Sequence, residues 1–180
     1  TYYYKVAAVN SSGTGTLSAV GSALLSASIQ GSETYNAHTY AMTSAAMTFA
    51  EAKAAAAAVG GYLTTVNTKA ENTFLTNEFY AAYGNKALWI GANDIATENT
   101  WVWDNGTTSG DSGVTDNICG TGCNPKSTAE WPDGTRKWNW SGSGEPNDSG
   151  GEDCANITRS DGTWNDLDCD RDQYGIIEFD

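Results

Sequence analysis

Apolar residues recur at helical spacing in two segments, both in the first half of the chain. The first segment reads TFAEAKAAAAAVGG, with Thr48 and Glu51 near its start and Gly60 and Gly61 at its end. A threonine followed three residues later by a glutamate forms a capping box, and glycine commonly follows the last helical residue. This pattern predicts a helix between Thr48 and Gly60.

The second segment, TKAENTFLTNEFYAAYG, has the same organisation. Thr68 and Glu71 stand at its start, and Gly84 ends it. Its apolar side chains are expected to share one face of a helix. The residues of that face are Phe74, Leu75, Phe79 and Ala82.

Short apolar runs separated by turn residues follow in the second half. Runs at 87–91, 100–104, 154–158 and 174–179 predict strands. The long region between the second and third runs is rich in glycine and tryptophan and reads as a loop. A loop of that length in a compact domain is expected to be functional or stapled.

The first residues, TYYYKVAAVNSSGTG, alternate large and small side chains over 2–8 and reach a turn at 12–13. This pattern predicts a strand that runs into a turn. The segment resembles the tail of a fibronectin type III module, and a strand added to the following domain is an equally good interpretation. We expect residues 1–32 to be a strand and a connector over 22–32, and residues 33–180 to be the main domain.

Length and charge narrow the class of protein. A chain of 180 residues can bury one substantial core. Its net charge of −13, from 22 acidic against 9 basic residues, argues against nucleic acid and anionic membranes as partners and fits calcium. No apolar run approaches the roughly 20 residues of a membrane span, so no membrane insertion is expected. No basic and apolar leader precedes Thr1, so the chain reads as a processed product or a fragment.

The cysteines form an even set in an acidic, glycine-rich and serine-rich sequence, which favours an oxidising compartment. We favour disulfides between Cys119 and Cys123 and between Cys154 and Cys169. Zinc is the competing interpretation, but the spacings do not make two CxxC pairs and His38 is the single histidine. The second disulfide would close a loop of about 15 residues, worth roughly 3 kcal/mol in the chain-entropy model.

Several phrases of the chain occur together in the order typical of one family. They are FAEAKAAAAAVGGYL, LWIGAND, GEPN, GEDC and GTWNDLDC. Over residues 35–180 the sequence thereby resembles the C-type lectin-like domain. The resemblance implies an α+β fold in which two helices pack on small antiparallel sheets beside a long calcium-binding loop region.

The acidic stretch GEPNDSGGED needs a cation, because its carboxylates have no lysine or arginine nearby in sequence. Calcium prefers about six to eight oxygen ligands, which carboxylates and amide carbonyls from two loops can supply. The resemblance assigns the following residues to one calcium site that also binds the ligand: Glu145, Asn147, Glu152, Asn165 and Asp166. It also implies a cis peptide bond before Pro146.

The five side chains leave coordination positions that two vicinal sugar hydroxyls can take. Glu145 and Glu152 would accept the hydroxyl protons, and the side-chain amides of Asn147 and Asn165 would donate. In the family, glutamate before the proline and asparagine after it go with equatorial hydroxyls. The resemblance therefore implies a ligand of the mannose, glucose and fucose class rather than galactose.

A second calcium site is expected near the phrase NDIATEN. The resemblance assigns Asp94 and Glu98 to it, completed by Asp148, Glu152 and Asp153. The alternative is that Asp94 and Glu98 only solvate a turn, since short motif matches often fail.

The chain also departs from the family. Ala56 and Ile177 stand where the family has a disulfide between the first helix and the last strand, which implies apolar packing between these elements instead. The insertion 105–131, with Cys119 and Cys123, has no counterpart in the family.

Some tryptophans and the histidine are expected to be structural, and other tryptophans are candidates for contact with a ligand. We expect Trp89, Trp164 and His38 to be structural, because indoles contribute large buried areas in small domains. Trp131 and Trp138, near the insertion, are the candidates for contact with a ligand.

The leading hypothesis is calcium-dependent carbohydrate binding by an adhesion module of a larger extracellular protein, such as a bacterial adhesin. One alternative is a lectin-like scaffold with structural calcium that binds a protein, ice or another non-sugar ligand through the insertion. The other is a glycosidase that uses Glu145 and Asp166. We expect no enzyme, because calcium would neutralise these carboxylates.

Overall fold

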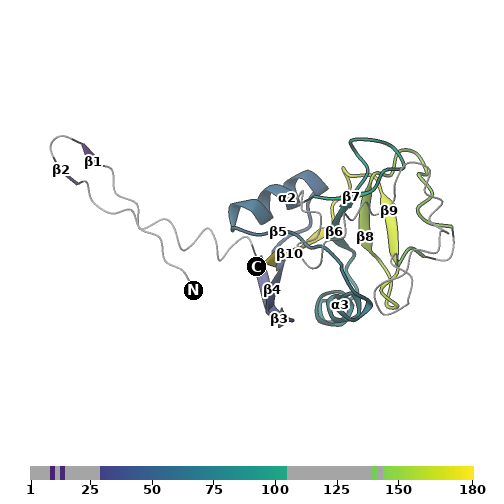
Figure 1. Cartoon of the computed structure of the whole chain (residues 1–180), viewed down its shortest axis with the longest axis horizontal. Coiled ribbons are helices and arrows are strands. Elements are labelled where there is room, and N and C mark those ends of the chain that lie inside the picture. Colours follow the sequence, from purple (N-terminus) through teal and green to yellow (C-terminus); the bar gives the residue numbers. More distant parts are fainter. Residues whose placement is uncertain (1–8, 11–12, 15–28, 105–138, 142–143) are drawn as a thin grey trace.

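The computed structural model describes residues 9–10, 13–14, 29–104, 139–141 and 144–180 (Figure 1). Among the first residues, β1 (Val9–Asn10) pairs antiparallel with β2 (Gly13–Thr14). The strand expected at 2–8 lies outside the described residues, and so do the insertion 105–131, Cys119, Cys123, Trp131 and Trp138. The division of the chain at residue 32 stays a prediction.

Eight strands form the main sheet, in the order β3-β4-β10-β6-β8-β9, with β5 paired to β10 and β7 paired to β6. Their bounds are β3 (Ile29–Tyr35), β4 (His38–Thr43), β5 (Tyr62–Leu63), β6 (Leu88–Asn93), β7 (Val102–Trp103), β8 (Cys154–Ile157), β9 (Trp164–Leu167) and β10 (Tyr174–Phe179). All pairs are antiparallel except β10 with β6, which is parallel. The α+β fold with two helical segments is confirmed, and its strands form one mixed sheet.

The first helix, α2 (Phe49–Ala58), begins with the predicted capping box. The Thr48 side chain accepts from the Glu51 amide, and the Thr48 amide donates to Glu51 Oε2 at 3.0 Å. At the other end, the Gly61 amide donates to Ala56 O at 3.0 Å. A Cβ at Gly61 would lie 2.6 Å from Glu178 O, so only glycine lets the chain pass this close to β10.

The second helical segment differs from the prediction in its second half. Helix α3 (Lys69–Leu75) starts at the predicted cap, where Thr68 Oγ1 accepts from the Glu71 amide at 3.1 Å, and then continues as the π-helix η1 (Thr76–Ala81). The wider turn rotates the following residues relative to an α-helix. Tyr80 is therefore buried, and Ala82, which we expected on the apolar face, is exposed.

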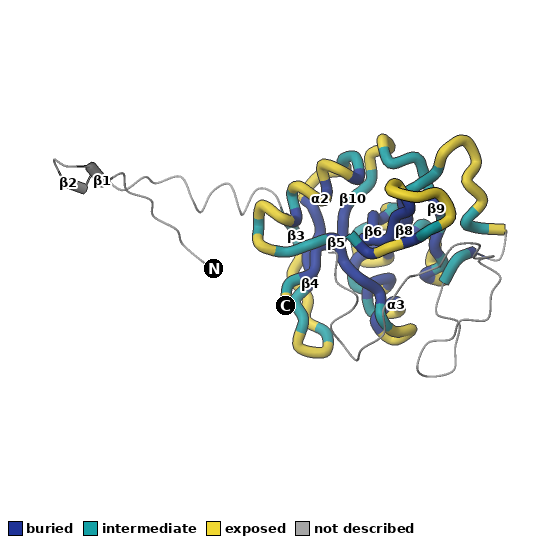
Figure 2. Tube along the Cα trace, turned by 45° about the horizontal axis from the view of Figure 1, so that its top comes forward, coloured by how far each residue is buried: buried dark blue, intermediate teal, exposed yellow. Residues whose placement is uncertain are grey.

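The core lies between these helices and the sheet. Figure 2 shows β6 and β8 as buried tubes, and every residue of both strands is buried. Trp89 and Trp164 are fully buried, which confirms their structural role. Ala56 and Ile177 are also fully buried, and α2 packs against β10, so apolar packing takes the place of the family's disulfide.

Four predicted strands correspond to β6, β7, β8 and β10, but β3, β4, β5 and β9 were missed. Residues 29–32, which we expected in a connector, belong to β3. The buried run of β4 does not alternate: Tyr40 and Met42 belong to the core cluster, and α2 also packs against this strand.

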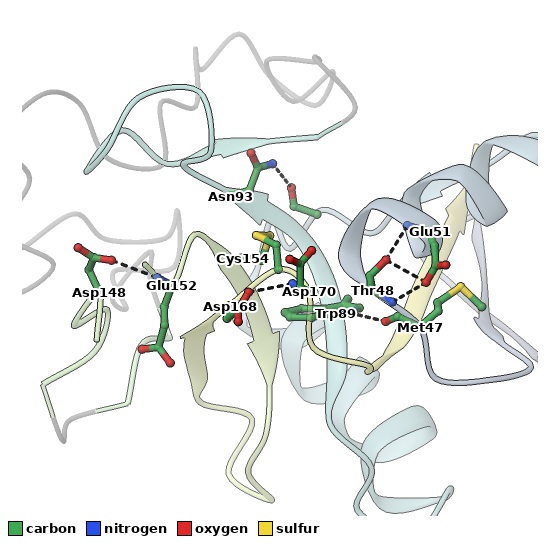
Figure 3. Close-up of a disulfide and its surroundings, with 12 residues drawn as sticks. Met47, Thr48, Glu51, Trp89, Asn93, Asp148, Glu152, Cys154, Asp168 and Asp170 are labelled. Atoms are coloured by element: carbon green, nitrogen blue, oxygen red, sulfur yellow. Dashed lines mark hydrogen bonds between the residues drawn. A yellow bond between two sulfur atoms is a disulfide. The ribbon is translucent and has the colours of Figure 1, made fainter. Parts of the chain in front are cut away.

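The disulfide between Cys154 and Cys169 is present, with 5.3 Å between the Cα atoms. It ties the first residue of β8 to the segment after β9 (Figure 3). The pair therefore fixes the end of the sheet from which the acidic stretch emerges.

Candidate functional site

Asp166 is the centre of the site at this end of the sheet. It lies on β9, opposite Ala155 of β8, and is fully buried. Its Oδ2 accepts hydrogen bonds from the amides of Asn147 at 2.8 Å and Asp148 at 2.7 Å. Its Oδ1 is buried and has no hydrogen-bond partner among the described residues. One oxygen thus holds the loop, and the other is left for a further ligand.

The loop held by Asp166 turns at a cis peptide bond between Glu145 and Pro146, as expected. On either side of the proline, the Asn147 side-chain amide donates to Glu145 Oε2. The side chains of Glu145 and Asn147 therefore lie together beside Asp166. On β9, the Asn165 side-chain amide bonds to the backbone oxygen of Asp166.

Glu152 is not brought fully into this group. The Glu152 amide donates to Asp148 Oδ1 at 3.1 Å (Figure 3). The Glu152 carboxylate accepts from the Ser149 amide at 3.2 Å, so these residues form a compact turn before Cys154. Within the described residues, the carboxylates of Glu145, Glu152 and Asp166 do not form a group whose oxygens all lie within 4.8 Å of one another. Four of the predicted residues, Glu145, Asn147, Asn165 and Asp166, thus lie together, whereas the Glu152 carboxylate bonds to the Ser149 amide of its own loop.

A second group contains Asp94, Glu98 and Asp153, whose carboxylate oxygens all lie within 4.8 Å of one another. The pairing of Asn93 on β6 with Cys154 on β8 brings Asp94 beside Asp153, and the Asp94 amide donates to Asp153 O at 3.1 Å. Asp148, which we also expected here, does not belong to this group of three.

Asp94 resembles Asp166 in its surroundings. It is 3% exposed, and its Oδ1 is buried without a hydrogen-bond partner in the part of the chain that the structure describes. Its Oδ2 accepts from the Asn99 amide at 2.9 Å, and the same amide lies 3.1 Å from Glu98 Oε1. Asn99, with φ of 60°, thus orients both carboxylates. This role of Asn99 was not predicted from the sequence, although an asparagine directly after Glu98 is a signal for such a turn.

Burial disfavours the charged forms of Asp166 and Asp94, and so it raises the pKa of both carboxyl groups. Burial raises the pKa of Asp166 to about 6, with Glu145 adding to the rise, although the amides of Asp148 and Asn147 oppose it. Burial likewise raises the pKa of Asp94 to about 7, and the nearby Glu98 and Asp153 contribute. A cation bound at either group would offset both the burial and the repulsion.

The types of ligand atom in the two groups indicate which cation fits. Both groups offer carboxylate oxygens, and the first adds the side-chain amides of Asn147 and Asn165. Hard oxygen donors in irregular geometry suit Ca²⁺. Each group also contains a buried carboxylate oxygen that has no partner in the described part of the chain, which is costly unless the oxygen is bound. The residues therefore fit calcium at both places.

Comparisons with known proteins agree with this fold. The family model described as "Lectin C-type domain" matches residues 45–177. A curated relative from Gorilla gorilla gorilla, "C-type lectin domain family 4 member M", is 33% identical over 120 residues, which is 67% of this chain and 24% of that protein. "Lectin BRA-3" of Megabalanus rosa is 28% identical over 149 residues, or 81% of this chain and 73% of that protein. The chain spans 23%, 23% and 28% of the length of the first three matching relatives.

Solved structures with the same fold include proteins of different binding behaviour. The mouse scavenger receptor C-type lectin carbohydrate-recognition domain has a TM-score of 0.61 and 22% identity, covering 83% of this chain and 95% of that one. A calcium-independent type II antifreeze protein has a TM-score of 0.60 and 19% identity, covering 83% and 91%. The cow CD23 carbohydrate-recognition domain, solved in the presence of an oligosaccharide, has a TM-score of 0.60 and 21% identity, covering 82% and 92%. At these identities the structures show the fold alone.

Proposed function

This chain belongs to the C-type lectin domain family, a family that binds and does not catalyse, and we propose that it binds carbohydrate through a calcium ion held by Asp166 and the loop around Pro146. The ligands are Glu145, Asn147, Glu152, Asn165 and Asp166. The second group, Asp94, Glu98 and Asp153, would hold a further calcium; Asp148 and Glu152, which we also expected there, lie outside this group of three. No helix in the described part of the chain is long and apolar enough to cross a membrane.

The buried Asp166 carboxylate is the observation that supports this proposal best. Its Oδ2 fixes the two amides that follow Pro146, and its Oδ1 has no partner among the described atoms. Bound calcium would supply a positive charge that polarises two sugar hydroxyls. The chain's own residues then orient the sugar, because carboxylates accept from hydroxyl groups and amide NH₂ groups donate to them.

The side chains beside Pro146 support a particular class of sugar. Glu145 offers acceptors and Asn147 a donor, and the hydrogen bond between them places both side chains on one side of the loop. We propose ligands with vicinal equatorial hydroxyls, of the mannose, glucose and fucose class. The biological role that follows is adhesion by an extracellular module of a larger protein, where repeated weak contacts add through multivalency.

Calorimetric titration tests the proposal. Mannose, fucose and galactose are titrated separately into the domain, once with calcium and once with a chelator. We expect heat from mannose and fucose only with calcium. The Asn165→Ala variant should lose this heat, while Asn77→Ala, the same change at an exposed asparagine on η1, should retain it.

Three results would contradict this proposal or favour an alternative. Sugar binding that survives the chelator contradicts the calcium mechanism. Calcium that stabilises the domain without heat from any sugar favours the scaffold alternative, in which the loops bind a protein or another non-sugar ligand. Release of reducing sugar by the pure domain would support a glycosidase.

A further inference from the structure

We infer that the domain has a separate zinc site, made by His38 of β4 with Glu178 and Asp180 at the end of β10. The three donor atoms, one imidazole nitrogen and two carboxylate oxygens, all lie within 4.8 Å of one another. None of these residues belongs to the calcium groups described above. The site therefore does not depend on the proposed sugar binding.

The distances fit a tetrahedral metal ion. His38 Nδ1 lies 3.0 Å from Glu178 Oε1 and 3.6 Å from Asp180 Oδ1. Ligand bonds of roughly 2.0–2.1 Å to tetrahedral zinc put the donor atoms about 3.3 Å apart. His38 Nδ1 is itself buried and makes no well-aligned hydrogen bond to a described atom. The nitrogen thus lies close to both carboxylates without donating to either along a favourable direction.

Outer hydrogen bonds hold both carboxylates. In Glu178 most of these bonds use Oε2, whereas Oε1 faces His38. In Asp180 the oxygen that faces His38, Oδ1, also accepts from Tyr62. Glu178 is 1% exposed, and its Oε2 accepts from Thr64 Oγ1 at 3.1 Å, from the Thr65 amide at 3.0 Å and from Thr65 Oγ1 at 3.2 Å. Tyr62 donates its hydroxyl to Asp180 Oδ1 at 2.8 Å. Such outer partners orient the ligands in protein metal sites.

Local charge favours a cation at this place. Within the described residues, no lysine or arginine forms an ion pair with Glu178 or Asp180, and a protonated His38 would balance one of the two charges. On the inner side, the Tyr40 hydroxyl donates to Glu71 Oε1 at 2.8 Å and lies 3.4 Å from Glu178 Oε1. Glu71 therefore adds a further acidic group behind the site rather than a compensating base.

The donors select zinc over calcium. An imidazole nitrogen with two carboxylate oxygens suits a borderline metal such as Zn²⁺, whereas calcium requires more oxygen ligands. Asp180 is exposed, so a water molecule can reach the fourth position. In Figure 1 the C-terminal end lies beside β4, away from β8 and β9, and two strands separate β4 from β8 in the sheet.

Metal titration tests the site. Zinc is titrated into the full chain by calorimetry with excess calcium present, so that the acidic loops are already filled. We expect one zinc ion per chain and, with Co²⁺ in place of zinc, the visible absorption of a tetrahedral complex. His38→Gln and Asp180→Asn should each weaken zinc binding by more than the ~10–100-fold that loss of an outer partner causes. Asp170→Asn, a matched change of an exposed carboxylate, should leave it unchanged.

A second measurement uses the wild-type protein and does not depend on variants that fold. His38 is the one histidine of the chain, so its imidazole nitrogen resonances are assigned without ambiguity. Zinc should shift the Nδ1 resonance of His38 at one equivalent in calcium. The proposal is overturned if that resonance does not move, or if zinc binds equally well to His38→Gln and Asp180→Asn.

Discussion

Asp166 and Glu178 are both fully buried carboxylates on strands of the same sheet, but their surroundings differ. Both oxygens of Glu178 lie near donors, three of them from Thr64 and Thr65. Asp166 uses one oxygen for two loop amides, and its Oδ1 has no partner among the described residues. Glu178 is therefore held in place by the chain's own donors, whereas Asp166 Oδ1 at the β9 end has no such donor among the described residues and is left for a bound ion.

The largest expected effect is at the β9 end. Asp166→Asn keeps an oxygen for the amides of Asn147 and Asp148 but removes the charge. We expect calcium to lose its stabilising effect on the loop around Pro146, and mannose binding to fall below detection. Melting curves with and without calcium, together with sugar calorimetry, measure this. Asp161→Asn, an exposed aspartate that caps its own turn, serves as the control.

Removal of the disulfide should have the next largest effect, a loss of stability at the same β9 end of the sheet. Replacing Cys154 and Cys169 by serine opens a loop with a sequence separation of 15 residues. The chain-entropy model gives a loss of about 3 kcal/mol in the free energy of unfolding. Denaturant unfolding at saturating calcium measures it. A loss much below 1 kcal/mol would mean that packing alone fixes this end of the sheet.

Truncation of Glu178 should destabilise the β10 end of the sheet without changing calcium binding at the β9 end. Glu178→Ala leaves the buried amide of Thr65 without its acceptor, which costs about 1–3 kcal/mol of unfolding free energy. Because the site at Asp166 is separate, the increase in melting temperature caused by calcium should match that of the wild type. A reduced calcium response in this variant would contradict the independence of the two ends.

The pH dependence of stability and of calcium affinity also tests the part played by the buried aspartates. Burial raises the pKa of Asp166 to about 6 and that of Asp94 to about 7, so without calcium the fold favours their protonated forms. This contribution to stability is present at low pH and is lost as the pH rises through these values. Calcium binds the ionised carboxylates, so it must displace the protons bound at low pH. Below pH 6 the affinity of the domain for calcium should therefore fall by about tenfold per pH unit for each proton that calcium displaces. Calcium titrations from pH 5 to pH 8 measure this, and an affinity independent of pH would contradict it.

The smallest expected effect is at the cap of α2. Thr48→Ala removes the hydroxyl that accepts from the Glu51 amide, for a loss of about 1 kcal/mol. Calcium and sugar binding should be unchanged, because the Thr48 hydroxyl bonds to Glu51, which belongs to neither calcium group. Thermal unfolding and mannose titration on the same sample check both statements.

Local signals in the sequence predicted the local parts of the fold. Both helix starts follow from threonine and glutamate at fixed spacing, and the disulfide from the cysteine positions. The π-helical turn after Leu75 was missed, because nothing in the spacing of Phe79 and Ala82 distinguishes it from an α-helix. Strand β9 was missed because Asn165 and Asp166, its two central residues, were interpreted only as ligands.

The candidate site could be predicted only in part, for a physical reason. The resemblance supplied the residue types, but the closeness of Asp94 to Asp153 depends on the register of β6 with β8. The group of His38, Glu178 and Asp180 likewise depends on the pairing of β4 with β10, over more than a hundred residues of sequence. Such pairings are set by the whole sheet, and no short motif contains them.

The central claim is that Asp166 Oδ1 binds a calcium ion that in turn binds the sugar. A crystal structure of the domain grown with calcium and mannose tests it directly. We predict calcium within about 2.3–2.6 Å of Asp166 Oδ1 and of the side-chain oxygens of Glu145 and Asn147, with two vicinal mannose hydroxyls on the same ion. Calcium bound only by Asp94, Glu98 and Asp153, or mannose bound away from Asp166, would contradict the account.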